Sequence, residues 1–278
     1  MNKIICHYHI AYDVLRSLAT LAEFAKLDEL HIIDSFIYQA LEGNRVPTAE
    51  RSRVIVDCRA LLGPAFQLHV DAKQFVGIVK ILGRTKQASF CIEVKDSYIL
   101  RIPGGRLRLA KLPPPSHVVA PLRTDGAYDS CDGFQLKLTA SQLKILHALR
   151  GTPRAAVDIL IGRNQAQALA VPDPDMVRHG GTLGLLPLQA FPVAEWTRVE
   201  QTAELVLRSR RFIPDRCGNH AVTCKIQWLP QESRHWLIAT VRVGQVTAVF
   251  LEPLRLVRER CRQRPATEID AELATLVA

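Results

Sequence analysis

The chain has 278 residues and carries 36 Lys and Arg against 27 Asp and Glu, so its formal net charge of +9 predicts an anionic partner. Hydrophobic residues make up 48% of the chain and charged residues 23%, which excludes a mainly disordered protein and leaves room for one large domain or two smaller ones. The sequence contains no apolar run long enough to span a membrane and no signal-peptide core near its start, so we expect a cytoplasmic protein without membrane contact.

The N-terminal region predicts one helix followed by strands. Apolar residues from Val14 to Ala25 recur at helical spacing and indicate one buried helix face. Leu30–Tyr38 and Arg53–Cys58 are typical of strands, and Gly43 lies in a turn between them. We therefore expect a first unit of one helix packed on antiparallel strands.

The next stretch predicts a second unit of the same kind. Phe66, Leu68 and Val70 alternate as in a half-buried strand, Asp71 is an expected N-cap, and Gly83 is expected to end the helix that follows. Further strands are expected at Ser89–Val94, Tyr98–Ile102 and Arg106–Leu112.

A proline-rich segment from Lys111 to Gly133 interrupts this pattern. It contains three successive prolines and two Asp-Gly turn dipeptides, a composition typical of an interdomain connector. We therefore divide the chain into a first domain of residues 1–112, a connector of residues 113–133, a second domain of residues 134–253 and a basic C-terminal extension of residues 254–278.

An internal repeat straddles the connector. FQLHVDAKQFVGIVKIL begins at Phe66 and FQLKLTASQLKILHAL begins at Phe134, so the offset is 68 residues without a gap. Chance similarity between two amphipathic segments is the alternative. The repeat predicts that the second domain begins as a copy of part of the first.

The C-terminal half continues with strands. Val199–Leu207 alternates as a strand, and a short helix is expected at Arg208–Ile213, before Pro214. Strands are then expected at Ala221–Trp228, Trp236–Val243 and Val246–Leu251. The chain thus predicts four similar units, each with one helix on antiparallel strands, in an α+β fold.

The predicted helices share a basic surface. Lys73, Gly77, Lys80 and Arg84 lie on one face of the helix after Asp71, because they are three or four residues apart. A solvated surface explains any single stripe, but basic helices in several equivalent units predict one cationic face for the phosphate backbone of duplex DNA. The expected DNA-binding residues are Lys73, Lys80, Arg84, Lys86, Lys144, Arg150, Arg154, Arg208, Arg210 and Arg211.

Catalytic and metal-binding motifs are largely missing. The sequence has no phosphate-binding loop, dinucleotide fingerprint, zinc-protease helix or nucleophile elbow, so we expect no catalytic residue and no cofactor. Three groups of possible metal ligands lack the spacing of usual sites, and we predict no metal there: Cys6, His7 and His9; Cys217, His220 and Cys224; Asp173, Asp175 and His179. A metal-dependent nuclease, whose acidic residues come together only in the fold, remains an alternative.

The order of these elements resembles that of DNA sliding clamps, with the phage T4-type clamp as the nearest likeness and PCNA and the bacterial beta clamp as relatives by fold. The resemblance lies in FQLHVDAKQFVGIVKIL, SHVVAP, QLKLTASQLKILHALRGTPRAAVDILI, FIPDRCGNHAVTCKIQW and VTAVFLEP, and it covers most of residues 10–253. It implies two similar clamp-type domains, each with two helices packed on antiparallel sheets. It also implies a non-enzymatic homotrimeric ring whose helices line a hole for duplex DNA, and which tethers a DNA polymerase after assembly by a clamp loader.

The same resemblance implies a docking site for a partner's short peptide. Val118, Val119, Pro121 and Leu122 of the connector would form it together with Leu251 and Leu254 at a strand end. Simple packing of the connector onto the domain is the alternative explanation for these apolar residues.

Two features depart from the ring clamps. A net charge of +9 is closer to the herpesvirus-type processivity subunits, which share the fold but bind DNA as monomers. The Arg-rich stretch from Arg255, followed by an acidic and apolar end, looks like an appended tail. The alternative function is therefore a non-ring DNA-binding protein of a phage or mobile-element nucleoprotein complex.

Overall fold

The structure is a computed structural model of the chain. It describes residues 6–41, 51–115, 133–139, 141–142, 144–145, 148, 156–162, 166–171, 184–192, 202–210, 220, 222–229 and 233–261.

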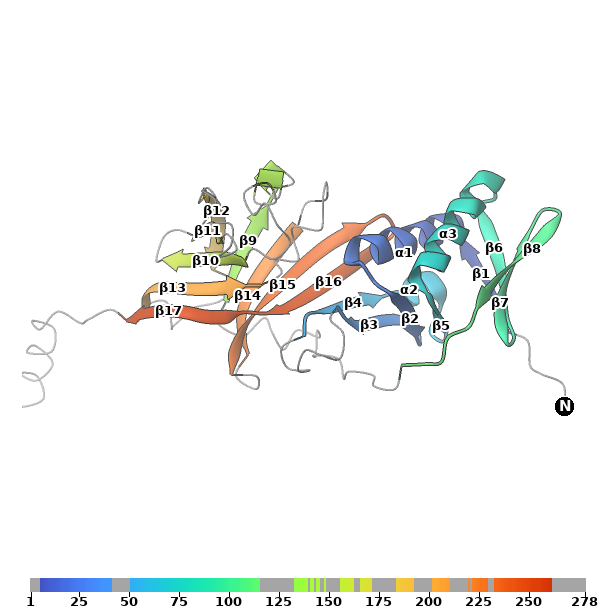
Figure 1. Cartoon of the computed structure of the whole chain (residues 1–278), viewed down its shortest axis with the longest axis horizontal. Helices are drawn as coiled ribbons and strands as arrows, with labels where there is room; N and C mark the ends of the chain where they lie inside the picture. Colours follow the sequence, from blue (N-terminus) through green and yellow to red (C-terminus); the bar gives the residue numbers. More distant parts are fainter. Residues whose placement is uncertain are drawn as a thin grey trace, which may run out of the picture.

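The first half contains three α-helices and eight strands within the described residues (Figure 1). In chain order they are β1 (Cys6–Ala11), α1 (Tyr12–Ala25), β2 (Glu29–Ile33), β3 (Phe36–Ala40), β4 (Arg53–Asp57), α2 (Arg59–Leu62), β5 (Leu68–Asp71), α3 (Ala72–Leu82), β6 (Ser89–Val94), β7 (Ser97–Ile102) and β8 (Gly105–Ala110). A short 3-10 turn, Gly83–Thr85, follows α3.

The second half is built mainly of strands, and its described residues between 141 and 148 are helical. Its strands are β9 (Gly133–Leu138), β10 (Ala156–Gly162), β11 (Ala166–Val171), β12 (Gly184–Pro192), β13 (Thr202–Ser209), β14 (Val222–Leu229), β15 (Arg234–Val243), β16 (Val246–Pro253) and β17 (Arg255–Cys261). Apart from the strand predicted at Leu30–Tyr38, the predicted strands are therefore present over the described residues, with shifts of a few residues at their ends.

The caps of the two repeated helices support the internal repeat. Asp71 accepts a hydrogen bond from the backbone N–H of Gln74 at 2.7 Å, which begins α3. In the second repeat, the hydroxyl of Thr139 accepts from the N–H of Gln142 at 3.2 Å, and the Gln142 side chain accepts from the N–H of Thr139 at 2.9 Å. These reciprocal bonds form a capping box. Both caps lie at the 68-residue offset of the sequence repeat.

The prediction of a single strand at Leu30–Tyr38 is wrong, because two residues turn the chain back on itself. Asp34 and Ser35 have positive φ angles of 48° and 62°, the backbone of a tight hairpin turn, and they separate β2 from β3. Ser35 is fully buried. Its N–H donates to the Phe66 carbonyl at 2.9 Å and its hydroxyl donates to the Gly63 carbonyl. These long-range hydrogen bonds hold the turn. The local sequence does not predict it, because it contains no glycine.

The units of each half exchange their first strands. In the first half, β1 pairs with β6 and β5 pairs with β2. In the second half, β9 pairs with β14 and β13 pairs with β10 in the same manner. Each half is thus a pair of interlocked units, and the chain consists of two similar domains.

A continuous sheet joins the two domains. Strand β16 of the second domain pairs with β4 of the first, with Ala248 opposite Val56 and Leu251 opposite Arg53. This pairing completes a 13-stranded sheet, while β1, β6, β7 and β8 form a separate four-stranded sheet. The molecule is elongated, with the two domains side by side along its length (Figure 1).

Alternate residues at this seam pack on opposite faces of the sheet. Phe250 belongs to the core beneath the helices, where its ring lies 5.2 Å from that of Phe24 on α1. On the other face, a second cluster forms around the buried residues Ile55, Trp236 and Leu251. We call this second cluster, with its half-buried members, the outer apolar patch: Tyr38, Ile55, Trp236, Ile238, Val249 and Leu251.

The predicted helix at Arg208–Ile213 does not begin where we expected, because Arg208 and Ser209 are the last residues of β13. The expected C-terminal extension also begins differently. Its residues Arg255–Cys261 form β17, which pairs antiparallel with β13 and extends the sheet by one strand. Among the described residues, no helix is long and apolar enough to cross a membrane.

Candidate nucleic-acid interface

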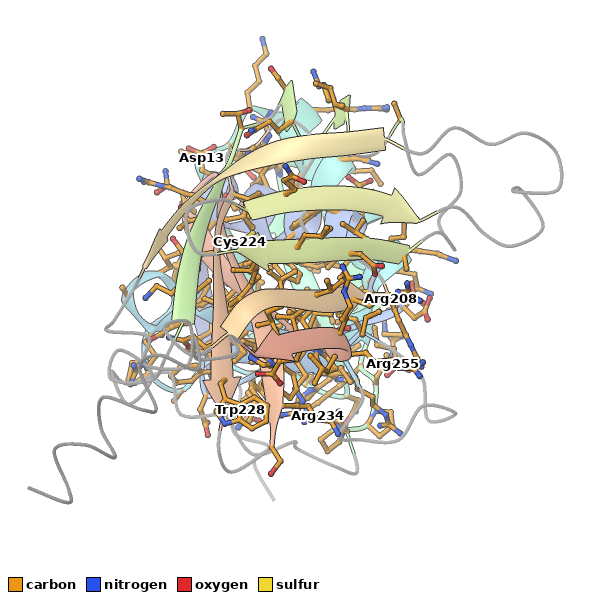
Figure 2. The ribbon with its side chains drawn as sticks, turned by 90° about the vertical axis from the view of Figure 1, so that its left-hand side faces the viewer. Asp13, Arg208, Cys224, Trp228, Arg234 and Arg255 are labelled. Carbon is orange, nitrogen blue, oxygen red and sulfur yellow. The ribbon has the colours of Figure 1, made fainter. Side chains whose placement is uncertain are left out.

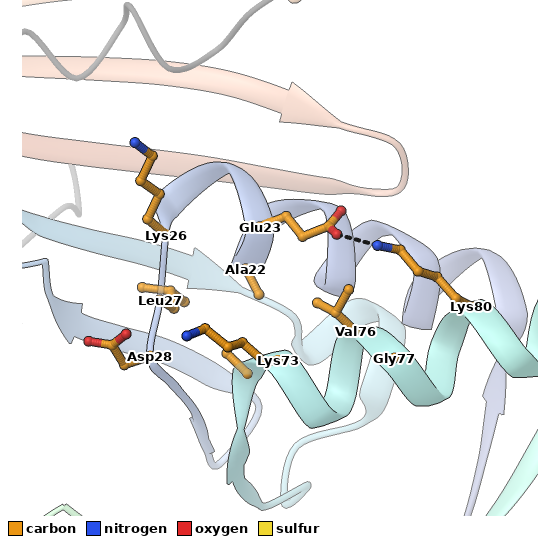
Figure 3. A pocket seen from close by; sticks show the side chains of 10 residues that line it. Ala22, Glu23, Lys26, Leu27, Asp28, Lys73, Val76, Gly77 and Lys80 are labelled. Carbon is orange, nitrogen blue, oxygen red and sulfur yellow. Dashed lines mark hydrogen bonds and ion pairs between the residues drawn. The ribbon is translucent and has the colours of Figure 1, made fainter. Parts of the chain in front are cut away.

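Helices α1 and α3 of the first domain lie side by side and expose a basic groove. Its volume is about 520 Å³, and Figure 3 shows Lys26 of α1's C-cap and Lys73 and Lys80 of α3 around it. The acidic side chains at the groove are Glu23 and Asp28. We call the exposed surface of α1 and α3 around this groove the helix face.

The predicted stripe on α3 is exposed, as its spacing required. Asp71 caps the helix, and the apolar residues of α3 turn toward the core, which leaves Lys73, Gly77 and Lys80 in solvent. Arg84 in the 3-10 turn and Lys86 just after it are also exposed. The stripe is therefore a continuous surface feature.

One residue of the stripe has an acidic neighbour that the sequence did not reveal. Lys80 Nζ lies 2.6 Å from Glu23 Oε1 of α1, and the two side chains are 67% and 50% exposed. An exposed pair of this kind contributes about 0–1 kcal/mol and yields easily to a competing anion. Lys26, Lys73, Arg84 and Lys86 form no ion pair within the described part of the chain.

The repeated helix of the second domain presents a different surface. At the 68-residue offset, Lys73, Gly77 and Lys80 of α3 correspond to Ser141, Ile145 and Ala148, which are all exposed and uncharged. Lys144 is also exposed, but it stands beside this stripe. The basic face is therefore concentrated on the first domain among the described residues, while the predicted residues Arg150 and Arg154 lie outside them.

Arg208 and Arg210 do not join the helix face, because the segment that carries Arg208 is a strand. They line a cavity of about 440 Å³ together with Arg234 and Arg255. Figure 2 shows Arg208 and Arg255 on the neighbouring strands β13 and β17, with Arg234 and Trp228 below. We call this the arginine-lined cavity. The third arginine predicted in this segment, Arg211, lies outside the described residues.

Arg208 has a structural partner within that cavity wall. Its guanidinium donates two hydrogen bonds to the Asp158 carboxylate, at 2.6 and 2.8 Å. This bidentate contact raises the pKa of Arg208. The contact also fastens β13 to β10, so part of the Arg208 charge is already neutralised.

The two predicted peptide-binding residues of the second domain differ in position: Leu251 lies in the outer apolar patch, and Leu254 belongs to the main core. Leu251 is 4% exposed in the outer apolar patch, and Leu254 is 5% exposed at the wall of the arginine-lined cavity. Both side chains are therefore buried. The connector residues of the same prediction, Val118, Val119, Pro121 and Leu122, lie outside the described residues.

Two surfaces of the described residues are not predicted as such by the sequence, although it singles out Leu251, Arg208 and Arg210 individually. The outer apolar patch combines strands from both domains, so its members come from positions as distant as Tyr38 and Leu251. The arginine-lined cavity depends on the pairing of β17 with β13. The alternation of buried and exposed positions along β15 and β16 is the sequence signal that predicts the patch, whereas no local pattern predicts the cavity.

The described residues contain no group of three side chains placed to hold a metal ion. Cys58 is buried, and burial raises the pKa of its thiol to about 12, which suits a packing residue.

Comparisons with known proteins place the fold. No family model matches the chain, and no curated protein matches it by sequence. The fold is similar to that of PCNA from Thermococcus kodakaraensis, with a TM-score of 0.56 and 10% identity, covering 91% of this chain and 100% of that one. It is also similar to a structure of the PCNA2–PCNA3 complex from Sulfolobus tokodaii, with a TM-score of 0.54, 10% identity and coverage of 90% and 99%.

A third similar structure is A. fulgidus PCNA with the C-terminal region of FEN-1 bound. Its TM-score is 0.51 at 13% identity, and the match covers 92% of this chain and 100% of that one. The chain therefore has the two-domain sliding-clamp fold, with few helices on antiparallel sheets, at a level of sequence identity that shows the fold alone. The particular likeness to the phage T4-type clamp stays a prediction.

Proposed function

We propose that the chain is a non-enzymatic DNA sliding clamp that holds duplex DNA against its helix face and tethers a DNA polymerase as a processivity factor. The observation that carries this proposal is the exposed cationic stripe of α3 on a clamp fold. A surface of exposed lysines without aromatic neighbours suits backbone phosphates, because it attracts charge without reading bases. Such contacts exchange readily and permit sliding.

Equivalence between the units supports a closed ring. Strand β16, the last of its domain, pairs with β4 of the other domain within one chain. Strand β8 is the equivalent last strand of the first domain and lies at the edge of its sheet, and β12 is the equivalent of β4. Strand β12 already pairs with β11 and β9 within the chain, so we propose only that the open edge of β8 of one copy contacts the next copy and that three copies close a homotrimer.

The outer apolar patch supports a docking role. It offers apolar side chains from both domains on the face away from α1. A PCNA of the same fold has been solved with the C-terminal region of FEN-1 bound. We propose that a polymerase peptide docks on this patch, with Val118, Val119, Pro121 and Leu122 of the connector beside it, and that a clamp loader opens the ring in the host cytoplasm or nucleoid.

The test combines mass with DNA topology. Light scattering behind size-exclusion chromatography is expected to give the mass of a trimer. The protein is expected to stay on nicked circular DNA after loading and to leave linear DNA from its free ends. A monomer retained equally on both forms would refute the ring.

That outcome would favour the second candidate, a monomeric DNA-binding protein of a phage or mobile-element complex. The formal net charge of +9 is the observation that favours it. A monomer held by charge alone would also lose its DNA steeply with added salt, irrespective of DNA ends.

A further inference from the structure

The outer apolar patch continues into the arginine-lined cavity. Along β15, Arg234, Trp236 and Ile238 occupy alternate positions and therefore lie on one face of the sheet. Trp236 is opposite Pro253 and Ile238 is opposite Leu251 on β16, so the patch and the cavity wall share the same two strands. The two features form one surface with an apolar part and a cationic end.

Arginines are the charged residues that line the cavity among the described residues. Four arginines line it, and no carboxylate does so within the described part of the chain. The carboxylates behind its wall are engaged, since Asp158 binds Arg208 and Glu252 accepts a hydrogen bond from Ser209 at 2.8 Å. Arg255 and Arg210 are exposed. Guanidinium groups in this setting select an oxyanion, either carboxylate or phosphate.

The remaining surroundings favour a peptide over a nucleic acid. Strand β17 begins at the cavity and is the last strand of its sheet among the described residues, so its outer backbone edge can pair with another extended chain. Leu256 and Val257 on this strand are 48% and 44% exposed. Trp228, which lines the cavity, already packs its ring against His235 at 4.8 Å. Stacked bases would need a row of exposed rings, which these cavity residues do not supply.

We infer that this surface binds an extended segment of a partner protein whose apolar side chains cover the outer apolar patch and whose Asp or Glu side chains enter the arginine-lined cavity. The inference rests on the proposed tethering role and specifies the chemistry of the tethered peptide. Ile238 and Arg234 are four residues apart on β15, about 13 Å at roughly 3.3 Å per residue. An extended peptide would therefore carry its acidic residues about four positions from its apolar anchor.

The experiment is a selection of peptides from a random display library on the full chain, followed by binding measurements with fluorescent synthetic copies. The selected sequences are expected to combine apolar residues with Asp or Glu about four positions away. The double variant R234E/R255E is expected to weaken their binding at least tenfold. Peptides with Lys in place of the acids are expected to regain affinity for that variant.

A matched control lies on the same strand. Arg242 is exposed on the same face of β15 as Arg234, eight residues away, and Arg242→Glu is expected to leave peptide affinity unchanged. Circular dichroism melts of all variants establish that they are folded.

Three results would overturn the inference. If the selected peptides contain no acidic residues, the surface is an apolar docking site and the cavity has no role in it. The same conclusion follows if R234E/R255E binds the peptides with unaltered affinity. Displacement of the peptides by a single-stranded oligonucleotide at equal concentration would show that the cavity binds nucleic acid and not an acidic peptide. Retention of the protein on circular DNA, measured on the same preparations, tests the clamp role separately.

Discussion

Two buried histidines face each other across strands β2 and β5. His31 and His69 are opposite in register, and their Nδ1 atoms lie 3.2 Å apart, so one ring must donate a proton and the other must accept it. Burial lowers the pKa of His69, and the neighbouring His31 and Lys111 lower it further. The sequence predicted the strand and the adjoining Asp71 cap, because both depend on local pattern. It did not predict the histidine pair, since that depends on the register of two distant strands.

The histidine pair gives the folded state a definite pH dependence. Because the pKa of His69 is lower in the folded chain than in the unfolded one, the unfolded chain binds more protons, and stability is lost as the pH falls below the unfolded value of about 6.5. Urea unfolding between pH 8 and pH 5 is expected to show a steeper loss of stability for the wild type than for His69→Gln. Parallel curves for the two proteins would contradict this account.

At the scale of single elements, periodicity predicted α1 and α3 well because each has one apolar face and a clear boundary. The prediction that a helix begins at Arg208 is wrong for a tertiary reason. Asp158 on β10 binds Arg208, and this contact holds the segment in strand β13. The basic residues of the same segment are also typical of the C-terminus of a helix. The same pairing keeps Arg208 and its neighbour Arg210 away from the helix face. Sequence spacing places residues on an element, but it does not place the element on the molecule.

The stripe of α3 makes a direct prediction for DNA binding. Replacing Lys73, Lys80 and Arg84 with Glu is expected to abolish DNA association, because the stripe is exposed and, among the described residues, only Lys80 of the three forms an ion pair. Milder variants with Gln are expected to make the slope of log affinity against log salt shallower, by about one unit for each phosphate that a replaced side chain no longer neutralises.

Thermal melts serve as the control for these variants. Only a few tenths of a kcal/mol are expected to change, since surface substitutions away from packed features rarely cost more than about 0.5 kcal/mol. Unchanged DNA affinity in a folded triple variant would exclude the helix face as the interface.

A substitution at Gly77 tests DNA binding and stability separately on the same helix. A Cβ atom at this exposed position meets no atom within 4 Å, so the glycine serves no packing need. Gly77→Ala is expected to stabilise the protein by about 0.5–1 kcal/mol through helix propensity and to leave DNA affinity unchanged. Chemical denaturation measures the first quantity and fluorescence anisotropy the second. A destabilised Gly77→Ala would mean that α3 is packed differently at this point.

At the scale of the whole molecule, the two domains share one sheet and one core. Phe250 comes from the last strand of the second domain, yet its ring packs on Phe24 of the first helix. The resemblance to clamps predicted the two similar domains. It did not reveal how much core they share, because this depends on the contact between strands at opposite ends of the sequence.

The shared core predicts cooperative unfolding. We expect a single calorimetric transition, and Phe250→Ala is expected to lower it as a whole by about 3–5 kcal/mol of unfolding free energy. A variant with two separated transitions would show that the domains unfold independently and that the seam contributes little.

The pairing of β16 with β4 also sets an order of events during synthesis. Val56 meets its partner Ala248 only after 192 further residues have been added. At about 5–20 residues per second, the edge of β4 waits roughly 10–40 s before it is covered. An unpaired edge of apolar Val and Ile residues is a template for aggregation during that interval. The nascent first domain is therefore expected to need a chaperone, or slow translation at low temperature, more than the finished protein does.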